Sequence, residues 1–133
     1  FDSYLTSDSN DMFDPIRGQN GTLDMTKPLS SYWINSSHDT FKAGESACDG
    51  VYRALARGCR SIELTVYDGE GSNKREPMVC SGPKDSTKTL VLDILKTIKT
   101  FIRNNSDIYP IILHLENHCT LRVQNKIARY LQD

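Results

Sequence analysis

Apolar residues recur three and four positions apart in three segments of this chain, and this spacing predicts amphipathic helices. The first helix is expected after Ser46, which suits an N-cap with Asp49 three residues on, and Gly58 suits its end. The second is expected over residues 90–102 and the third over residues 120–131. The predicted buried faces consist of Cys48, Val51, Tyr52 and Leu55; of Val91, Ile94, Leu95, Ile98 and Ile102; and of Val123, Ile127 and Leu131.

Shorter segments between these helices have the composition of β-strands. Residues 60–66 (RSIELTV) alternate between apolar and polar side chains, as in a strand with one buried face. Residues 110–115 (PIILHL) are almost continuously apolar, which is typical of a buried parallel strand. Residues 32–34 and 77–80 are expected to form two further short strands. The predicted order is β-α-β-β-α-β-α, which favours an α/β fold with a parallel sheet.

The first residues differ in composition from the rest of the chain. Residues 1–24 are polar and rich in Asp, Asn and Gly, so we interpret them as a linker or as the tail of a preceding region. They also lack the long apolar core of a signal peptide. Residues 25–133 are the predicted folded part, and 133 residues in all is about one domain.

Charge and cysteine content exclude several classes of protein. The formal net charge is −1, so no strong positive field argues for nucleic acid. No apolar run approaches the length of a transmembrane helix. The four cysteines form no C-x-x-C pair, which argues against a zinc site. Two disulfides are one arrangement for them, but free buried thiols in a reducing compartment are the simpler interpretation.

Polar side chains gather at the predicted strand ends. His38 and Asp39 follow the first strand, Glu63 and Thr65 share one face of the second, and Glu116 follows the PIILHL run. Active sites of α/β barrels lie at such strand ends, and a cluster rich in oxygen ligands suits Ca²⁺ or Mg²⁺. Each residue alone has an ordinary explanation, because a lone histidine is usually a surface or core residue and a strand glutamate often pairs with an arginine such as Arg60.

Three segments together resemble a known family. MTKPLSSYWINSSHDTF, RALARGCRSIELTVYDG and YPIILHLENHC are similar, in this order, to blocks of the X-region of eukaryotic phosphoinositide-specific phospholipase C. The resemblance runs from about Met25 to the end of the chain. It implies the first half of a distorted TIM-like (β/α) barrel that pairs with a Y-region half, in the same polypeptide or as a fragment. By the same analogy, residues 1–24 follow an EF-hand-like region.

The resemblance also implies a chemistry and its residues. The family cleaves phosphatidylinositol lipids to diacylglycerol and inositol phosphate, using two histidines and Ca²⁺. His38 matches the histidine that stabilises the phosphate in the transition state. The calcium ligands match Asp39, Glu63, Thr65 and Glu116. Calcium lowers the pKa of the inositol 2-hydroxyl, which attacks phosphorus.

The chain departs from the family pattern within the site itself. Asp39 stands where the family has Asn, and Thr65 stands where it has Asp, so the calcium site is altered. Pro83 replaces the second histidine, and the loss of a general acid typically costs on the order of 10²–10⁴ in rate. The neighbouring Lys84 is a poor proton donor at neutral pH. We interpret His114 as a core histidine; the alternative is that it replaces the missing acid.

These departures lead to three functional hypotheses. The first is a calcium-dependent phospholipase that is impaired in this copy. The second is a catalytically inactive, phospholipase-like barrel that binds lipid, inositol phosphate or protein in signalling. The third is a half-barrel that does not catalyse and has only a structural role. We expect the protein to be cytoplasmic and peripheral at the membrane. The short loop FKAGES has Phe41 as its only large apolar side chain, so we expect weak membrane insertion.

Overall fold

The structure of the chain is a computed structural model, and it describes residues 3, 7, 24, 26–38, 40–41, 45–80, 87–105, 108 and 110–132. Asp39, Pro83, Lys84 and most of residues 1–24 lie outside this described part. The chain divides into two compact units, Phe1–Trp33 and Ile34–Asp133. The described part of the first unit holds a short 3₁₀ turn, η2 (Leu29–Ser31), where Tyr32 accepts a hydrogen bond from the Lys27 amide.

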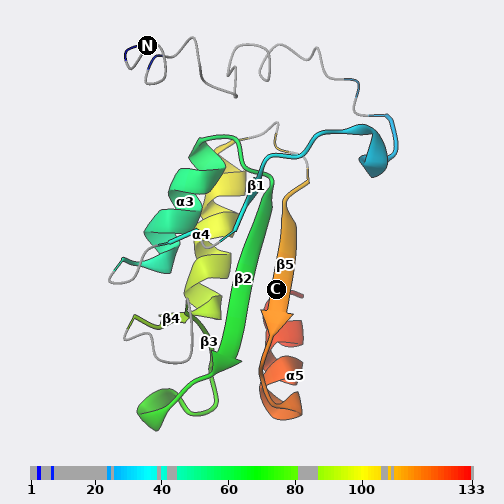
Figure 1. The fold of residues 1–133 in the computed structure, drawn as a ribbon. Coiled ribbons are helices and arrows are strands. Elements are labelled where there is room, and N and C mark those ends of the chain that lie inside the picture. Colours follow the sequence, from blue (N-terminus) through cyan, green and yellow to red (C-terminus); the bar gives the residue numbers. More distant parts are fainter. Residues whose placement is uncertain are drawn as a thin grey trace. The chain divides into compact units, whose positions relative to one another are not determined.

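The second unit contains a five-stranded mixed sheet built around one long strand, β2 (Ser61–Asp68) (Figure 1). The strand β5 (Ile112–Asn117) runs parallel to β2 along one edge, and β1 (Ser36–Ser37) is parallel on the other. The strand β3 (Pro77–Val79) is antiparallel to β2, and β4 (Thr89–Leu90) is antiparallel to β3. The turn η3 (Gly71–Asn73) lies between β2 and β3.

Two details of the strand prediction are wrong. The first strand is not at residues 32–34 but at Ser36–Ser37, because the backbone pairs there with Ser61 and Ile62 of β2. Pairing partners, which apolar composition does not reveal, decided this position. The sheet is also not wholly parallel, because the few residues between β2 and β3 allow only an antiparallel return. The parallel prediction is confirmed for β1, β2 and β5.

The three predicted helices are confirmed as α3 (Ala47–Ala56), α4 (Val91–Asn104) and α5 (Leu121–Tyr130). Gly58 has a φ of 89°, the left-handed conformation expected of a residue that follows a helix end. Three predicted core positions are wrong. Tyr52 is 52% exposed, and its ring meets the edge of the core through an edge-to-face contact with Phe101. Ile102 is 44% exposed, because Phe101 occupies the core side of that turn, and Leu131 is 50% exposed, because it lies beyond the last residue of α5.

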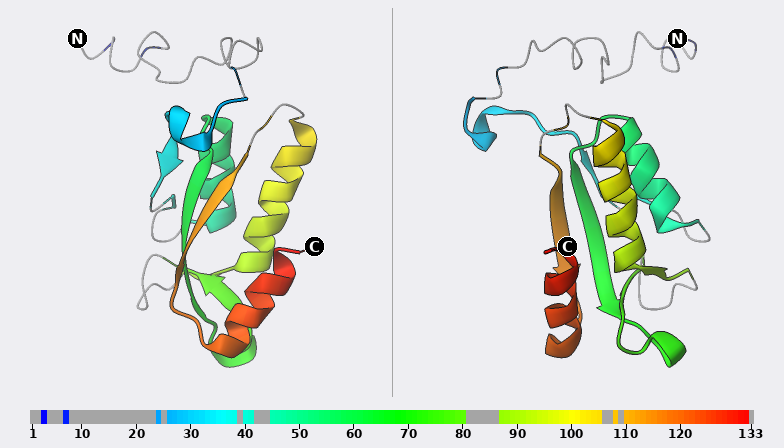
Figure 2. Two further views of the ribbon diagram at one scale, coloured as in Figure 1. Left: turned by 90° about the vertical axis from the view of Figure 1, so that its right-hand side faces the viewer. Right: turned by 180° about the vertical axis from the view of Figure 1, so that it is seen from behind.

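All three helices contribute to one core on a single face of the sheet, and Figure 2 (left) shows α4 and α5 on the same side of β2 and β5. Alternate residues of β2, namely Ile62, Leu64 and Val66, are almost fully buried in this core. The same cluster contains Val51 of α3, Ile94 of α4 and Val123 of α5. Burial of each such side chain stabilises the fold by roughly 1.5–3 kcal/mol. The intervening residues of β2 therefore face the other side of the sheet.

The segment that follows His38 is packed against α3. A Cβ atom at Gly50 would lie 2.6 Å from the Thr40 carbonyl oxygen and 2.9 Å from the Phe41 Cβ, so the backbones approach too closely for any other residue. Phe41 is only 7% exposed, as part of the core. The Phe41 side chain is therefore buried against α3 and contributes to the core instead of the surface.

The cysteines agree with the expectation of buried thiols. None of the four forms a disulfide; Cys59, Cys80 and Cys119 are buried and Cys48 is half-buried. Burial, with Asp68 nearby, raises the pKa of the Cys119 thiol to about 11. Among the described residues, no helix is long and apolar enough to cross a membrane.

Candidate functional site

The face of the sheet opposite the helices carries the polar residues predicted from the sequence. Glu63 and Thr65 project from this face of β2 because they alternate with its buried residues. The parallel register places Thr65 beside Glu116 of β5, and Glu63 beside His114. Pairing of β2 with β5 therefore brings together residues that lie 51 positions apart in the sequence.

Both oxygens of the Glu116 carboxylate are engaged. Thr65 Oγ1 donates a hydrogen bond to Glu116 Oε2 at 3.0 Å, and His118 Nε2 lies 3.1 Å from Glu116 Oε1. The hydrogen bond from Thr65, with a smaller contribution from His118, lowers the pKa of Glu116 below its ordinary value. Glu116 is thus held as a carboxylate in a fixed orientation.

His118 belongs to this site, although the sequence analysis did not single it out. Its ring stacks on Tyr67 of β2, with centroids 4.7 Å apart and planes 12° from parallel. Its backbone amide donates to the Val66 carbonyl at 2.9 Å, which extends the pairing beyond the end of β5. The available signal was its position two residues after Glu116, which gives both side chains the same direction along an extended chain.

His38 meets Glu63 at the end of β1. His38 Nε2 lies 3.4 Å from Glu63 Oε1, while the histidine side chain is 71% exposed. Next to it, the Ser37 and Thr40 hydroxyls form a hydrogen bond at 3.0 Å. Glu63 does not pair with Arg60, whose guanidinium donates to the Leu55 and Cys59 carbonyls instead. The predicted histidine and the predicted carboxylate therefore belong to one site.

His114 lies on this polar face rather than in the core, and its side chain is exposed. The interpretation as a core histidine is therefore wrong for the chain as described. The reason is its register: residues 114 and 116 alternate with the apolar residues of β5, so both point away from the helices. Glu116 takes its hydrogen bonds from Thr65 and His118.

The donor atoms at this face fit a hard cation. Glu63 and Glu116 supply carboxylate oxygens and Thr65 supplies a hydroxyl, and Ca²⁺ binds oxygen ligands of these kinds. Within the described part of the chain, no three His, Cys, Asp or Glu side chains are grouped as a metal site would require. Asp39 lies outside the described residues. Glu63, Thr65 and Glu116 are therefore the described residues that could supply ligands to a hard cation.

The described part of the chain is thus an α/β half-sheet with a histidine–carboxylate cluster on the face that its helices leave uncovered. The model of the family "Phosphatidylinositol-specific phospholipase C, X domain" matches residues 25–133. The chain belongs to this family. The family resemblance that the sequence motifs predicted is therefore confirmed.

Relatives and solved structures agree with this assignment. The chain is 39% identical to human 1-phosphatidylinositol 4,5-bisphosphate phosphodiesterase delta-4, which it covers to 18%, and 39% identical to mouse eta-2, which it covers to 9%. In both cases 100% of the chain is matched. The crystal structure of L. pealei PLC21 superposes with a TM-score of 0.72 at 31% identity, covering 96% of this chain and 16% of that one.

These matches also place the fold. The chain is the first half of a distorted TIM-like (β/α) barrel, as the sequence predicted. The polar face of β2 and β5 then points toward the barrel interior, because the helices of such a barrel lie on its outer side. The chain spans less than a fifth of the length of the curated relatives it matches.

Proposed function

We propose that this chain is the X-half of a calcium-dependent phospholipase that cleaves phosphatidylinositol lipids to diacylglycerol and inositol phosphate, and that turnover in this copy is impaired. The observation that carries the proposal is the cluster of His38, Glu63, Thr65 and Glu116 on one face of the half-barrel. The impairment rests on Pro83, which occupies the position of the second histidine.

In the proposed reaction, His38 donates a hydrogen bond to a phosphate oxygen and so stabilises the charge that develops there. The inositol 2-hydroxyl loses its proton to solvent water and attacks phosphorus, and the bond from phosphorus to the diacylglycerol oxygen breaks. Water then opens the resulting cyclic phosphate to give inositol phosphate. Glu63, Thr65 and Glu116, with Asp39, would hold Ca²⁺. When bound, Ca²⁺ supplies Lewis-acid stabilisation and lowers the pKa of the attacking hydroxyl.

The departing diacylglycerol oxygen needs a proton, and Pro83 cannot donate one. Proline has no side-chain group that exchanges a proton, so the leaving oxygen must be protonated by water. We expect a rate on the order of 10²–10⁴ below that of a chain with a general acid at this position. The neutral Thr65 also predicts weaker Ca²⁺ binding than a carboxylate there would give.

Pro83 and Thr65 also favour the second candidate function, a barrel that binds ligand but does not turn over substrate. Such a protein keeps His38 and the carboxylates for a phosphate or cation but lacks the acid. In either case we propose a Y-region half as partner, because Glu63, Thr65 and Glu116 stand at a face that none of the described helices covers. We further propose that the protein is cytoplasmic and acts at the membrane surface.

The test is to co-express this chain with the Y-region of a relative and to measure Ca²⁺-dependent release of inositol phosphate. Pro83→His should raise the rate by on the order of 10²-fold or more, because it restores a general acid. Pro110→His, a change of the same kind at an exposed position after α4, is the matched control and should leave the rate unaltered. Turnover by the unmodified chain at the level of the relatives would refute impairment.

Calorimetry separates the two candidates if hydrolysis is absent. A binding barrel retains heat of binding for a soluble inositol phosphate, and this heat is reduced by His38→Ala. An inert scaffold shows no such heat. In the same assay, Thr65→Asp should increase the affinity for Ca²⁺, because it restores a carboxylate between Glu63 and Glu116.

A further inference from the structure

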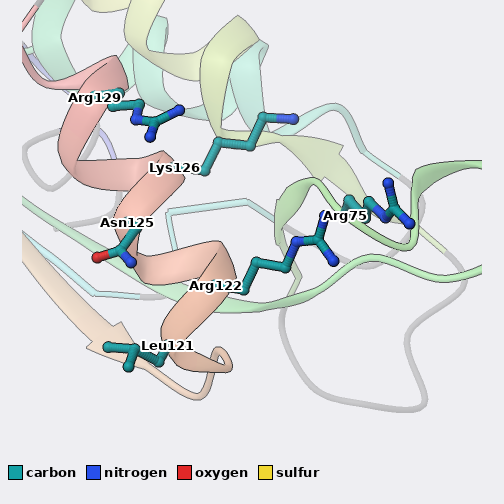
Figure 3. A pocket seen from close by; sticks show the side chains of 6 residues that line it. All are labelled: Arg75, Leu121, Arg122, Asn125, Lys126 and Arg129. Carbon is teal, nitrogen blue, oxygen red and sulfur yellow. The ribbon is translucent and has the colours of Figure 1, made fainter.

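A second group of charged residues lies on the helical side of the sheet, around α5. A hollow of about 540 Å³ is lined by Arg75, Leu121, Arg122, Asn125, Lys126 and Arg129. In Figure 3, Arg122, Lys126 and Arg129 leave the same side of α5, and Arg122 extends toward Arg75 from the loop between β2 and β3. Four cations therefore surround one space in a chain whose net charge is −1.

The spacing of residues along α5 creates this concentration of charge. Arg122, Lys126 and Arg129 are four and three positions apart, so they form one stripe on the helix. The first turn of α5 contains no acidic residue, and a cation there opposes the helix dipole. Like charges at this spacing also repel one another. Helix stability therefore does not explain the presence of Arg122. A bound anion would offset both the repulsion from the helix dipole and the repulsion among the cations.

The hollow is built rather than accidental, because a hydrogen-bonded network fixes its wall. Glu76 accepts hydrogen bonds from Lys126 and, at 2.8 Å, from the Tyr130 hydroxyl. These bonds lower the pKa of Glu76, with Lys126 contributing most. Because Arg75 precedes Glu76 in the chain, the network holds its backbone next to α5.

The loop that carries Arg75 is braced at both ends. The Gly69 amide donates to the Glu76 carbonyl at 2.8 Å, and a Cβ at Gly69 would lie 2.1 Å from the Asn73 carbonyl oxygen. At the start of α5, the Thr120 amide donates to Asp68 at 3.0 Å. The loop and the helix are thus tied together on both sides of the hollow.

The charges of the hollow are only partly balanced. Lys126 is neutralised by Glu76, but in the described part of the chain no carboxylate forms an ion pair with Arg75, Arg122 or Arg129. Guanidinium groups donate in a planar fork that matches two oxygens of a phosphate. Three of them around a concavity of small-molecule size suit a ligand with more than one phosphate group.

We propose that this hollow binds a small polyanion that carries two or more phosphate groups. The hollow is distinct from the proposed catalytic site, because Val123 and Ile127 seat α5 on the helical side of the sheet, whereas Thr65 and Glu116 face the other side. Phosphates of this chemistry occur both on soluble inositol polyphosphates and on lipid head groups.

The test is titration of the chain with inositol hexakisphosphate, followed by calorimetry and by the backbone amide resonances of α5. The double variant Arg122→Gln/Arg129→Gln should weaken binding at least about tenfold, because two charge-assisted contacts are lost. The double variant Arg57→Gln/Arg103→Gln removes the same charge from two exposed positions outside the hollow and should change affinity less than twofold. His38→Ala should leave the ligand-induced shifts of the α5 amide resonances unchanged, because these resonances report on the hollow and not on the proposed catalytic site.

Equal weakening by both double variants would overturn the proposal, since binding would then follow net charge alone. Retained affinity in Arg122→Gln/Arg129→Gln, or preference for an Asp/Glu-rich peptide over inositol hexakisphosphate, would overturn it as well. Vesicles of phosphatidylcholine with and without phosphatidylinositol bisphosphate identify the source. If the chain binds these vesicles through its arginines and inositol hexakisphosphate displaces it, the ligand is the lipid head group. If the chain binds inositol hexakisphosphate but not the vesicles, the ligand is the free polyphosphate.

Discussion

Replacement of Gly50 by alanine tests whether the close packing of α3 on residues 40–41 positions His38. In an open helix this change stabilises by about 1 kcal/mol, because glycine loses more backbone entropy than alanine. Here the new Cβ would lie 2.6 Å from the Thr40 oxygen and 2.9 Å from the Phe41 Cβ. Both distances are well inside van der Waals contact.

The two contributions have opposite signs, and their sizes decide the outcome. Overpacking of a tight site costs typically about 1–3 kcal/mol. The Thr40 contact is to backbone, which cannot rotate away, so the cost should lie in the upper part of that range. After subtraction of the helix-propensity gain, we expect Gly50→Ala to lower the free energy of unfolding by about 1–2 kcal/mol.

Urea denaturation of the chain measures this free energy, with Asp49 as the matched control. The difference between Asp49→Ala and Asp49→Gly gives the local glycine-to-alanine effect at an exposed position of the same helix. Because residues 40–41 must move, the ring resonances of His38 should shift in Gly50→Ala and stay unchanged in both Asp49 variants. The reasoning would be refuted if Gly50→Ala stabilised the protein as much as the difference between Asp49→Ala and Asp49→Gly predicts, and if the His38 ring resonances did not shift.

Three further predictions follow from the packing and the charges. Lys126→Met should raise the pKa of Glu76, which carbon NMR measures. Because the pKa of Glu76 is lowered in the folded chain, the wild-type protein should be more stable than the variant at pH values above the ordinary carboxyl pKa. This difference in stability should disappear as the pH falls through the pKa of Glu76 in the folded chain. Thiol labelling followed by mass spectrometry should modify half-buried Cys48 first and leave Cys119, with its pKa of about 11, unlabelled at pH 8; equal labelling rates would contradict this. Ile94→Ala, at a fully buried position of α4, should cost about 2–5 kcal/mol in unfolding experiments, and a cost below about 1 kcal/mol would show that the core is misplaced.

The helices could be predicted from the sequence because their apolar spacing is a local property. One face of α4 must be apolar wherever it packs, so Val91, Ile94 and Ile98 were identified correctly. The exact width of the buried face depends on neighbouring elements, and for this reason Ile102 was misassigned and Phe101 was missed. Strand β1 was misplaced for a related reason, since its two serines carry no apolar pattern and become a strand only by pairing with β2.

The candidate site divides in the same way. Sequence motifs alone identified the family, and with it His38, Glu63, Thr65 and Glu116 as one group. Only the parallel register of β2 and β5 placed Thr65 against Glu116, because register depends on which residues face each other across two distant segments. The contacts of Glu116 with His118 and of His38 with Glu63 are likewise products of the sheet.

The sequence by itself determined the class of fold and the family, since these follow from composition, period and motif, and it places at position 83 the proline on which the proposal of impaired turnover rests. The tertiary structure decided which side of the sheet each residue occupies. It also buried Phe41 beneath α3 and joined Arg75 to the basic stripe of α5. The physical reason is that such neighbours are set by long-range packing, in which residues far apart in the chain exclude water together, and no local pattern encodes that partnership.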